Sequence, residues 1–321
     1  MAAETEVEAV VDWYLKTAYG RWEGPGVTPF FADRSRVGHF AVELTLVERG
    51  DPATLFRLLV MIAMFQSRRD VDIMAILRGM PARTVADLTS PSRLRVLTDG
   101  SSCDHLRSST ALVNSCDVAR AGRSATCASR PELRCHVKEA TSAIGRMGDM
   151  GKLPSSAWLT LGKAGVSGAV ERACQDELSP PKRADQLVAE LSRIHRIGRK
   201  LASLYVSALS TPELGVVAPW RPRIDGSRLV VVDGNVAAAV AIWRGPRARR
   251  TYDATATWIS KVADTMERRR NPALSPRLSP RFVQQAMYVF RSRFNRVAAH
   301  DGCATRRCSS CPSRVCPFRQ T

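Results

Sequence analysis

Apolar residues recur along this chain with the spacing of amphipathic helices. Residues 7–14 show them at i, i+3, i+4 and i+7, and comparable stripes follow at 55–62, 184–191, 201–208 and 258–266. Asp51 and Pro52 stand before the second stripe as an N-cap and a first-turn proline would. Further helices are predicted at residues 69–77, 235–243 and 282–290, the last of them directly before a cysteine-rich end. Alternation of apolar and polar residues never persists long enough to build a sheet, so the pattern predicts an all-α fold.

Two stretches interrupt the helical pattern. Residues 99–132 are rich in Ser, Arg, Cys and Asp without an apolar period, which predicts a long loop or a poorly ordered insertion. Residues 211–229 carry several prolines and glycines and predict a second connection.

The charge of the chain is large and unevenly distributed. Its 321 residues include 48 Lys+Arg against 30 Asp+Glu, a formal charge of +18, and residues 241–321 hold 17 of the basic and 4 of the acidic residues. This asymmetry favours a polyanionic partner such as a phosphate backbone, the alternative being the solvated surface of an Arg-rich chain. The longest apolar run, residues 58–65, is far shorter than the roughly 20 residues that span a bilayer. Because the first residues are acidic rather than basic, we expect no secretory signal and a cytoplasmic location.

The nine cysteines form two groups. The last four have spacings of four, two and four residues, which lets them reach one centre: Cys303, Cys308, Cys311 and Cys316. Four thiolates suit either a [4Fe–4S] cluster or zinc, and the single compact run favours the cluster. Four of the other cysteines lie between residues 103 and 135, where His105 or His136 could join them. Their spacings of twelve, ten and seven are too irregular to predict a second metal site.

A hairpin is predicted between two helices at residues 194–202, closed by Ile197 and Gly198. The first amides of a helix lack intrahelical partners and carry the positive end of the dipole, so such a hairpin can bind a phosphate. Lys200 falls in the first turn of the second helix, where the dipole disfavours a charged side chain. Lysine is scarce here (7 Lys against 41 Arg), and a neutral amine is a nucleophile whereas arginine stays protonated. Lys200 is therefore a candidate nucleophile, the alternative being a lysine that contacts phosphate or solvent.

A second candidate, Asp233, follows an apolar stretch and precedes the helix predicted at residues 235–243. This is a typical N-cap position. A carboxylate held by backbone amides also offers a fixed negative charge to a cationic centre. The two roles are compatible.

The order of these features resembles the helix-hairpin-helix DNA glycosylases of the endonuclease III superfamily, iron–sulfur type. A hairpin with Gly198-Arg199-Lys200 is followed by Asp233 in a Val-Asp-Gly-Asn-Val setting and then by the four-cysteine loop. Residues 58–70 are similar to the family helix that ends in a DNA-inserting glutamine, here Gln66. Residues 12–14, Asp-Trp-Tyr, resemble the opening helix of the adenine glycosylase branch.

The resemblance implies an architecture and a set of roles. It implies two helical domains with a DNA-binding groove between them: residues 49–228 with the helix-hairpin-helix motif, and residues 1–48 with 229–321 around a structural [4Fe–4S] cluster. Lys200 would attack C1′ of a flipped nucleotide, Asp233 would stabilise the cationic sugar and accept a proton, and the resulting Schiff base would allow β-elimination. The residues expected to contact DNA are Gln66, Arg196, Ile197 and Gly198.

The function expected from the resemblance is thus a DNA glycosylase with AP lyase activity, acting on a damaged or modified base in double-stranded DNA. Two alternatives stay open, a monofunctional glycosylase in which water attacks and a non-catalytic, metal-stabilised DNA-binding protein. We expect a monomer associated with the nucleoid rather than with a membrane.

Overall fold

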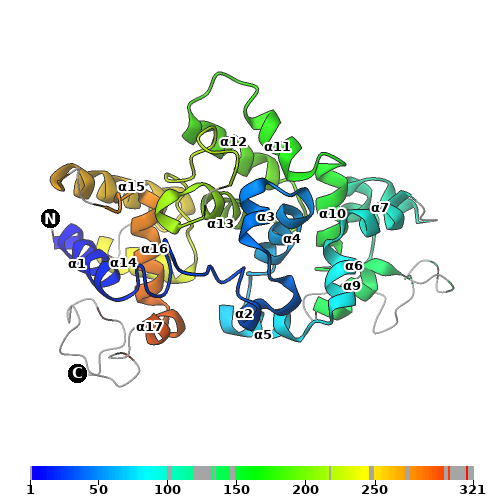
Figure 1. The fold of residues 1–321 in the computed structure, drawn as a ribbon, viewed down its shortest axis with the longest axis horizontal. Helices are drawn as coiled ribbons and strands as arrows, with labels where there is room; N and C mark the ends of the chain where they lie inside the picture. Colours follow the sequence, from blue (N-terminus) through cyan, green and yellow to red (C-terminus); the bar gives the residue numbers. More distant parts are fainter. Residues whose placement is uncertain are drawn as a thin grey trace. The chain divides into compact units, whose positions relative to one another are not determined.

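The computed structural model of the chain describes residues 2–99, 103–118, 127, 130, 132, 135–144, 149–216, 218–245, 249–271, 275–299, 303 and 316. Helices make up 67% of these residues, and no strand is found among them. This confirms the all-α prediction for the part of the chain that the structure describes. None of the helices in these ranges is long and apolar enough to cross a bilayer. The described residues cluster into two compact units (Figure 1).

The first unit comprises residues 1–29, 206–217 and 224–321. Its helices are α1 (Ala2–Thr17), η4 (Pro212–Leu214), α14 (Gly234–Arg244), α15 (Tyr252–Arg269), α16 (Pro280–Arg291) and α17 (Arg293–Ala299). Helix α16 is central, because it contacts α1, α14, α15 and α17 and buries nine of its twelve residues. The apolar stripe predicted at residues 7–14 lies in α1 and packs into the same core.

A charged side chain of the central helix is buried in this unit. Arg281 of α16 is only 2% exposed, and its Nε donates to Ser207 Oγ at 2.8 Å while its Nη1 donates to Gln284 Oε1 at 2.8 Å. Burial lowers the pKa of Arg281 to about 10, so the guanidinium still carries its charge at neutral pH. Gln284 Oε1 also accepts from the amide of Val231 at 3.3 Å. The network therefore fixes the segment that leads to Asp233.

The second unit comprises residues 30–205 and 218–223. Its helices before the first gap in the description are α2 (Arg34–Val37), η1 (Gly38–Phe40), α3 (Leu44–Arg49), α4 (Pro52–Ala63), α5 (Asp70–Gly79), α6 (Ala82–Thr89) and α7 (Pro91–Asp99). They are followed by η2 (Asp104–Arg107), α8 (Ser109–Ser115), α9 (His136–Ile144), α10 (Lys152–Leu161), α11 (Gly165–Ala173), α12 (Pro180–Leu191) and α13 (Arg199–Ser210). The last residues of α13 belong to the first unit.

Helix α4 is the centre of the second unit and contacts α3, α6, α10 and α11. It is apolar on nearly all sides, as expected of a helix surrounded by others. Asp51 caps it as predicted, because its Oδ2 accepts from the amide of Thr54 at 2.7 Å.

Two sequence predictions about the elements are corrected. The insertion at 99–132 is not one long loop, since η2 and α8 lie within it. Ser108 caps α8 by accepting from the amide of Ala111 at 3.1 Å, and these helices are too short to produce a periodic apolar signal. The helix predicted at 282–290 is present as α16, but it is not the last before the cysteines, because α17 follows it. The domain boundaries at residues 49 and 228 stay predictions.

Candidate functional site

The chain turns sharply after α4, where the DNA-inserting residue was predicted. Ser67 has φ 58°, a left-handed conformation that is uncommon outside glycine. Gln66 Nε2 donates to the carbonyl of Ala63 and, at 3.3 Å, to the carbonyl of Arg196. Phe65 packs edge-on against Phe30 with ring centroids 5.3 Å apart. The side chain of Gln66 thus ties this loop to the predicted hairpin.

The predicted hairpin connects α12 to α13. Ile194 and Ile197 are each 2% exposed, and the amide of Ile197 donates to the carbonyl of Ile194 at 3.0 Å. The carbonyl of Gly198 accepts the first bonds of α13, from Leu201 at 3.0 Å and from Ala202 at 3.1 Å. The left-handed residue of the turn is Arg196, with φ 64°, and not the glycine. Ile197 therefore anchors the hairpin in the core, while Gly198 directly precedes the second helix.

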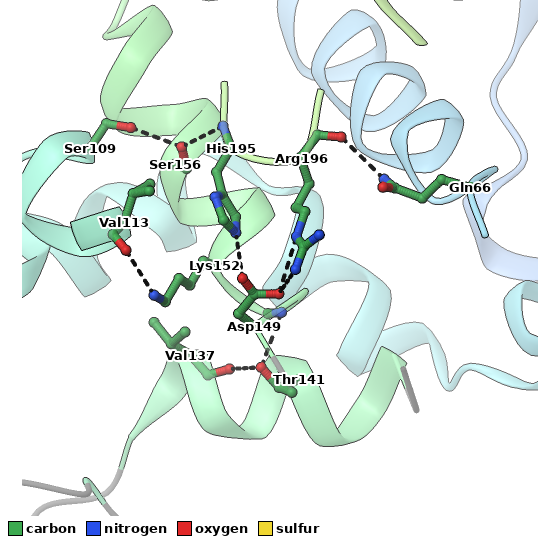
Figure 2. Close-up of polar contacts among 11 residues, drawn as sticks. Gln66, Ser109, Val113, Val137, Thr141, Asp149, Lys152, Ser156, His195 and Arg196 are labelled. Carbon is green, nitrogen blue, oxygen red and sulfur yellow. Dashed lines mark hydrogen bonds and ion pairs between the residues drawn. The ribbon is translucent and has the colours of Figure 1, made fainter. Parts of the chain in front are cut away.

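Asp149, which is not part of the hairpin, contacts two of its residues, His195 and Arg196 (Figure 2). Its Oδ1 accepts from Arg196 Nη2 at 2.7 Å and from Nε at 3.2 Å. Its Oδ2 lies 3.2 Å from His195 Nε2, without a well-directed hydrogen bond between them. Burial raises the pKa of Asp149, but the bonds and charge of Arg196 outweigh it and hold this pKa below its usual value. Burial lowers the pKa of His195 although Asp149 opposes that effect.

Two further contacts fix the positions of Asp149 and of the hairpin that it contacts. The amide of His195 donates to Ser156 Oγ of α10 at 3.1 Å. Gly151, two residues after Asp149, packs so closely on α9 that a Cβ there would collide with Thr141 Oγ1 and with the carbonyl of Val137. The hairpin is thereby bound to α9 and α10 as well as to the loop after α4. The Arg196 guanidinium is paired with Asp149. For the expected contact with DNA, a phosphate would therefore have to compete with the Asp149 carboxylate.

Lys200 lies in the first turn of α13, as predicted, and is half-buried. Its Nζ donates to the carbonyl of Phe65 at 3.5 Å. The amine of Lys200 therefore contacts the loop after α4, the loop that contains Gln66, although Lys200 and Phe65 are 135 positions apart in sequence.

Asp233 is the N-cap of α14 in the first unit, as predicted. Its Oδ1 accepts from the amide of Val236 at 2.8 Å, and the residue is half-buried. The preceding segment is fixed by Tyr252, whose hydroxyl donates to the carbonyl of Val230 at 2.7 Å. Lys200 and Asp233 belong to different units, so the pairing of these two residues stays a prediction.

Two of the four C-terminal cysteines are in the described part of the chain, and Arg296 of α17 contacts both. Its Nε lies 3.2 Å from Cys303 Sγ and its Nη2 lies 2.8 Å from Cys316 Sγ. The guanidinium is stacked over the ring of Phe290, 4.7 Å from the centroid. Cys308 and Cys311 lie outside the described residues. Within those residues, no three His, Cys, Asp or Glu side chains form a ready metal site.

The contacts of Arg296 fit a metal-binding use of these cysteines. The buried guanidinium donates to two of the sulfurs, and cysteine sulfurs are the ligands of zinc and of iron–sulfur clusters. Burial lowers the pKa of Arg296, but its bonds to the two sulfurs outweigh this effect and raise it.

The structure thus brings together Gln66, Arg196 and Lys200 in the second unit. It adds Asp149 and Arg296, which the sequence reasoning missed. No protein-family model, curated protein or solved structure matches the chain.

Proposed function

We propose that this chain is a DNA glycosylase with AP lyase activity that removes a damaged or modified base from double-stranded DNA. The observation that carries the proposal is the contact of Lys200 with Phe65 in the loop after α4, the loop whose Gln66 contacts Arg196 of the hairpin. Schiff-base chemistry at C1′ requires an amine nucleophile, and the proposed role of Gln66 is to fill the stack that the flipped base leaves. The net charge of +18 supports a polyanionic partner.

In the proposed reaction the Lys200 nitrogen forms a bond to C1′ while the bond from C1′ to the base breaks. The base leaves with the bonding electron pair and takes up a proton. Opening of the sugar ring gives a protonated imine on Lys200, after which loss of a C2′ proton expels the 3′ phosphate. Asp233 is proposed to stabilise the cationic sugar and to accept the proton that Lys200 releases. The DNA-binding groove and the helix-hairpin-helix motif expected from the sequence are part of this proposal.

Borohydride trapping tests the role of Lys200. Duplexes carrying a panel of damaged and modified bases are incubated with the protein and reduced, and a covalent adduct is expected with at least one of them. Lys200→Gln should abolish the adduct. Lys182→Gln is the matched control, because Lys182 is an exposed lysine in the first turn of the preceding helix α12 and should leave trapping unchanged. An adduct that survives in Lys200→Gln would refute the proposed nucleophile.

The role of Asp233 is tested with a variant that keeps its capping function. Asn caps a helix as well as Asp does, so Asp233→Asn removes the charge and keeps α14 in place. Base release should fall by about 10²-fold or more if the carboxylate works in proton transfer. Unchanged base release would restrict Asp233 to its capping role.

A monofunctional glycosylase is the second candidate, favoured by one contact. The bond from Lys200 Nζ to the Phe65 carbonyl gives the amine a structural use. If water is the nucleophile, Lys200→Gln should retain base release and no adduct should form with the unchanged protein. A protein that binds DNA in a salt-sensitive way but releases no base from any substrate would be a non-catalytic binding protein.

We further propose that the C-terminal cysteines hold a [4Fe–4S] cluster, with zinc as the alternative. The ligands would be Cys303, Cys308, Cys311 and Cys316. When bound, the cluster would be structural and would fix the basic C-terminal segment. A broad visible absorbance that bleaches on oxidation or reduction, with about four iron atoms per chain, is expected. Protein that contains zinc in place of iron at this site would favour the alternative.

A further inference from the structure

Two turns of the second unit that contact each other share an uncommon backbone conformation. Among the residues that the structure describes, Ser67 and Arg196 are the two non-glycine residues with a positive φ, 58° and 64°. Ser67 follows Gln66 in the loop after α4, and Gln66 Nε2 donates to the carbonyl of Arg196 at 3.3 Å. Left-handed residues other than glycine persist only where surrounding contacts hold them, and they concentrate at functional sites. The contacts that hold these two turns are therefore candidates for contacts that a ligand changes.

The contact that holds the Arg196 side chain is made by a carboxylate (Figure 2). Asp149 Oδ1 accepts from Arg196 Nη2 at 2.7 Å and from Nε at 3.2 Å. A guanidinium binds carboxylates and phosphates through the same planar set of N–H donors. Asp149 thus occupies the donors that Arg196 would offer to a DNA backbone under the proposed function, on which this inference rests.

This ion pair is accessible to a competing anion. The side chain of Arg196 is 38% exposed and that of Asp149 is 24% exposed. Both Arg196 donors are directed at the same oxygen, Oδ1, so the carboxylate does not use its two oxygens in a paired contact with the guanidinium. Ion pairs with this much exposure are weak. A backbone phosphate that can accept through two oxygens is therefore able to replace Asp149.

Asp149 keeps a compensating charge when Arg196 leaves it. Burial raises the pKa of Asp149, but Arg196 lowers it, and the charges of His195 and Lys152 lower it further. Asp149 Oδ2 lies 3.2 Å from His195 Nε2, and the neighbouring Lys152 is only 5% exposed. A partly buried carboxylate that lost all of its cationic neighbours would be strongly destabilised. Because Lys152 stays in place, loss of Arg196 does not create that situation.

The side chain proposed to enter the DNA stack is engaged within the protein as well. Gln66 Nε2 donates to the carbonyls of Ala63 and Arg196. Insertion of Gln66 into DNA would break its bond to the Arg196 carbonyl, and this bond holds the turn whose side chain Asp149 binds. The two contacts therefore oppose DNA binding at the same place.

We propose that the contact of Asp149 with Arg196 is autoinhibitory. In the free protein the carboxylate occupies Arg196, and binding of duplex DNA exchanges it for a backbone phosphate, while Asp149 stays beside His195 and Lys152. No covalent bond changes in this exchange. Because phosphate contacts carry no sequence information, Asp149 lowers the affinity for every duplex, including undamaged DNA.

Binding of an undamaged duplex tests the inference without any chemistry. Fluorescence anisotropy of a short labelled duplex at one fixed salt concentration gives the dissociation constant of the full chain. Asp149→Asn should bind about 5-fold more tightly than the unchanged protein, as expected when an ion pair of this exposure no longer competes. Glu171→Gln is the matched control, because it removes the same charge from a contact with another arginine of this unit, Arg223, and should change the affinity much less.

A double-mutant cycle tests whether the gain in affinity depends on Arg196. In the Arg196→Gln background, Asp149→Asn should have no more effect than Glu171→Gln has, because no guanidinium is left to release. A gain that persists without Arg196 would overturn the inference, since it would reflect net charge alone. Unchanged or weaker DNA binding by folded Asp149→Asn would also overturn it, because that result is expected if Asp149 only shapes the hairpin for DNA.

The same data separate this inference from the proposed function. Binding of an undamaged duplex requires no base release, so an Arg196-dependent gain in a protein that releases no base would refute the glycosylase alone. DNA binding without the gain would refute the autoinhibitory contact alone. If neither the unchanged protein nor Asp149→Asn binds the duplex, DNA is not the partner and both proposals are wrong.

A measurement on the unchanged protein covers the case in which Asp149→Asn fails to fold. Aspartate carboxyl carbons are isotopically labelled for NMR, and the Asp149 resonance is identified by its absence in Asp149→Glu. The position of this resonance in Arg196→Gln marks the carboxylate without its arginine. Saturating the unchanged protein with duplex at neutral pH should move the resonance to that position. A resonance that DNA leaves at its original position would contradict the exchange.

Discussion

Replacing Asp149 with Asn should loosen the hairpin at residues 192–198. The change removes the charge that accepts two N–H groups of Arg196, at 2.7 and 3.2 Å. Hydrogen bonds to charged groups contribute about 1.5–3 kcal/mol, and exposed ion pairs about 0–1 kcal/mol. With side-chain exposures of 24% for Asp149 and 38% for Arg196, we expect a loss between these limits, about 1–2 kcal/mol.

Hydrogen exchange of the amides at residues 192–198 measures this loss locally. A decrease of about 1–2 kcal/mol in the free energy of opening corresponds to roughly 5- to 30-fold faster exchange. Glu171→Gln is the control, because Glu171 forms a similar paired contact with Arg223 in the same unit but is 63% exposed. It should change exchange at the hairpin little. Equal exchange rates in Asp149→Asn and the unchanged protein would refute the argument that Asp149 clamps the hairpin.

The contacts of Asp149 with Arg196 and His195 should make the stability of the hairpin depend on pH. Arg196 holds the pKa of Asp149 below its unfolded value near 3.9, so this contribution is present above that pH and is lost as the pH falls through the folded pKa. Burial lowers the pKa of His195, so the folded hairpin loses stability as the pH falls below the unfolded value of about 6.5. In Asp149→Asn the opposing carboxylate is gone, and the total loss on the acid side should be larger. Exchange measured between pH 7.5 and pH 5, after correction for the intrinsic pH dependence, checks the sign.

Three further changes test other contacts. Arg296→Gln should make metal bound near the C-terminus easier to remove with a chelator, because the bonds to Cys303 and Cys316 are lost. Arg293→Gln is the control, because Arg293 is exposed and its replacement should not change metal removal. Equal chelator resistance of the two variants would contradict this prediction. Asp233→Ala should cost about 1 kcal/mol in urea unfolding through the lost cap, and Asp233→Asn much less. Tyr205→Phe should cost about 1 kcal/mol, because the hydroxyl of this buried residue donates to the carbonyl of Leu55 at 3.0 Å. Burial raises the pKa of Tyr205, so this loss should not vary with pH near neutrality.

Features of the fold encoded by neighbouring residues could be predicted. Asp51 before Pro52 gave the start of α4, and Asp233 was recognised as a cap, because an N-cap depends on amides only two or three residues away. Lys200 in the first turn of its helix follows from the same local logic. The short helix α8 was missed because seven residues carry too little periodicity.

Features that depend on distant partners could not be predicted. Glycine is the residue that turns usually place in the left-handed region, yet Arg196 occupies it here while Asp149, far away in the sequence, binds its side chain. The contact of Arg296 with two cysteines depends on how α17 packs on α16.

The contact of Arg296 with both Cys303 and Cys316 bears on the order in which the proposed C-terminal metal site would be assembled. These residues are the first and last cysteines of their group, so one guanidinium joins the two ends of the segment before any ion arrives. Bringing the two ends of the segment together costs conformational entropy. That cost would then be part of the free energy of protein folding and not of the free energy of metal binding. In the proposed metal site, an incoming ion would meet two sulfurs that already contact one guanidinium.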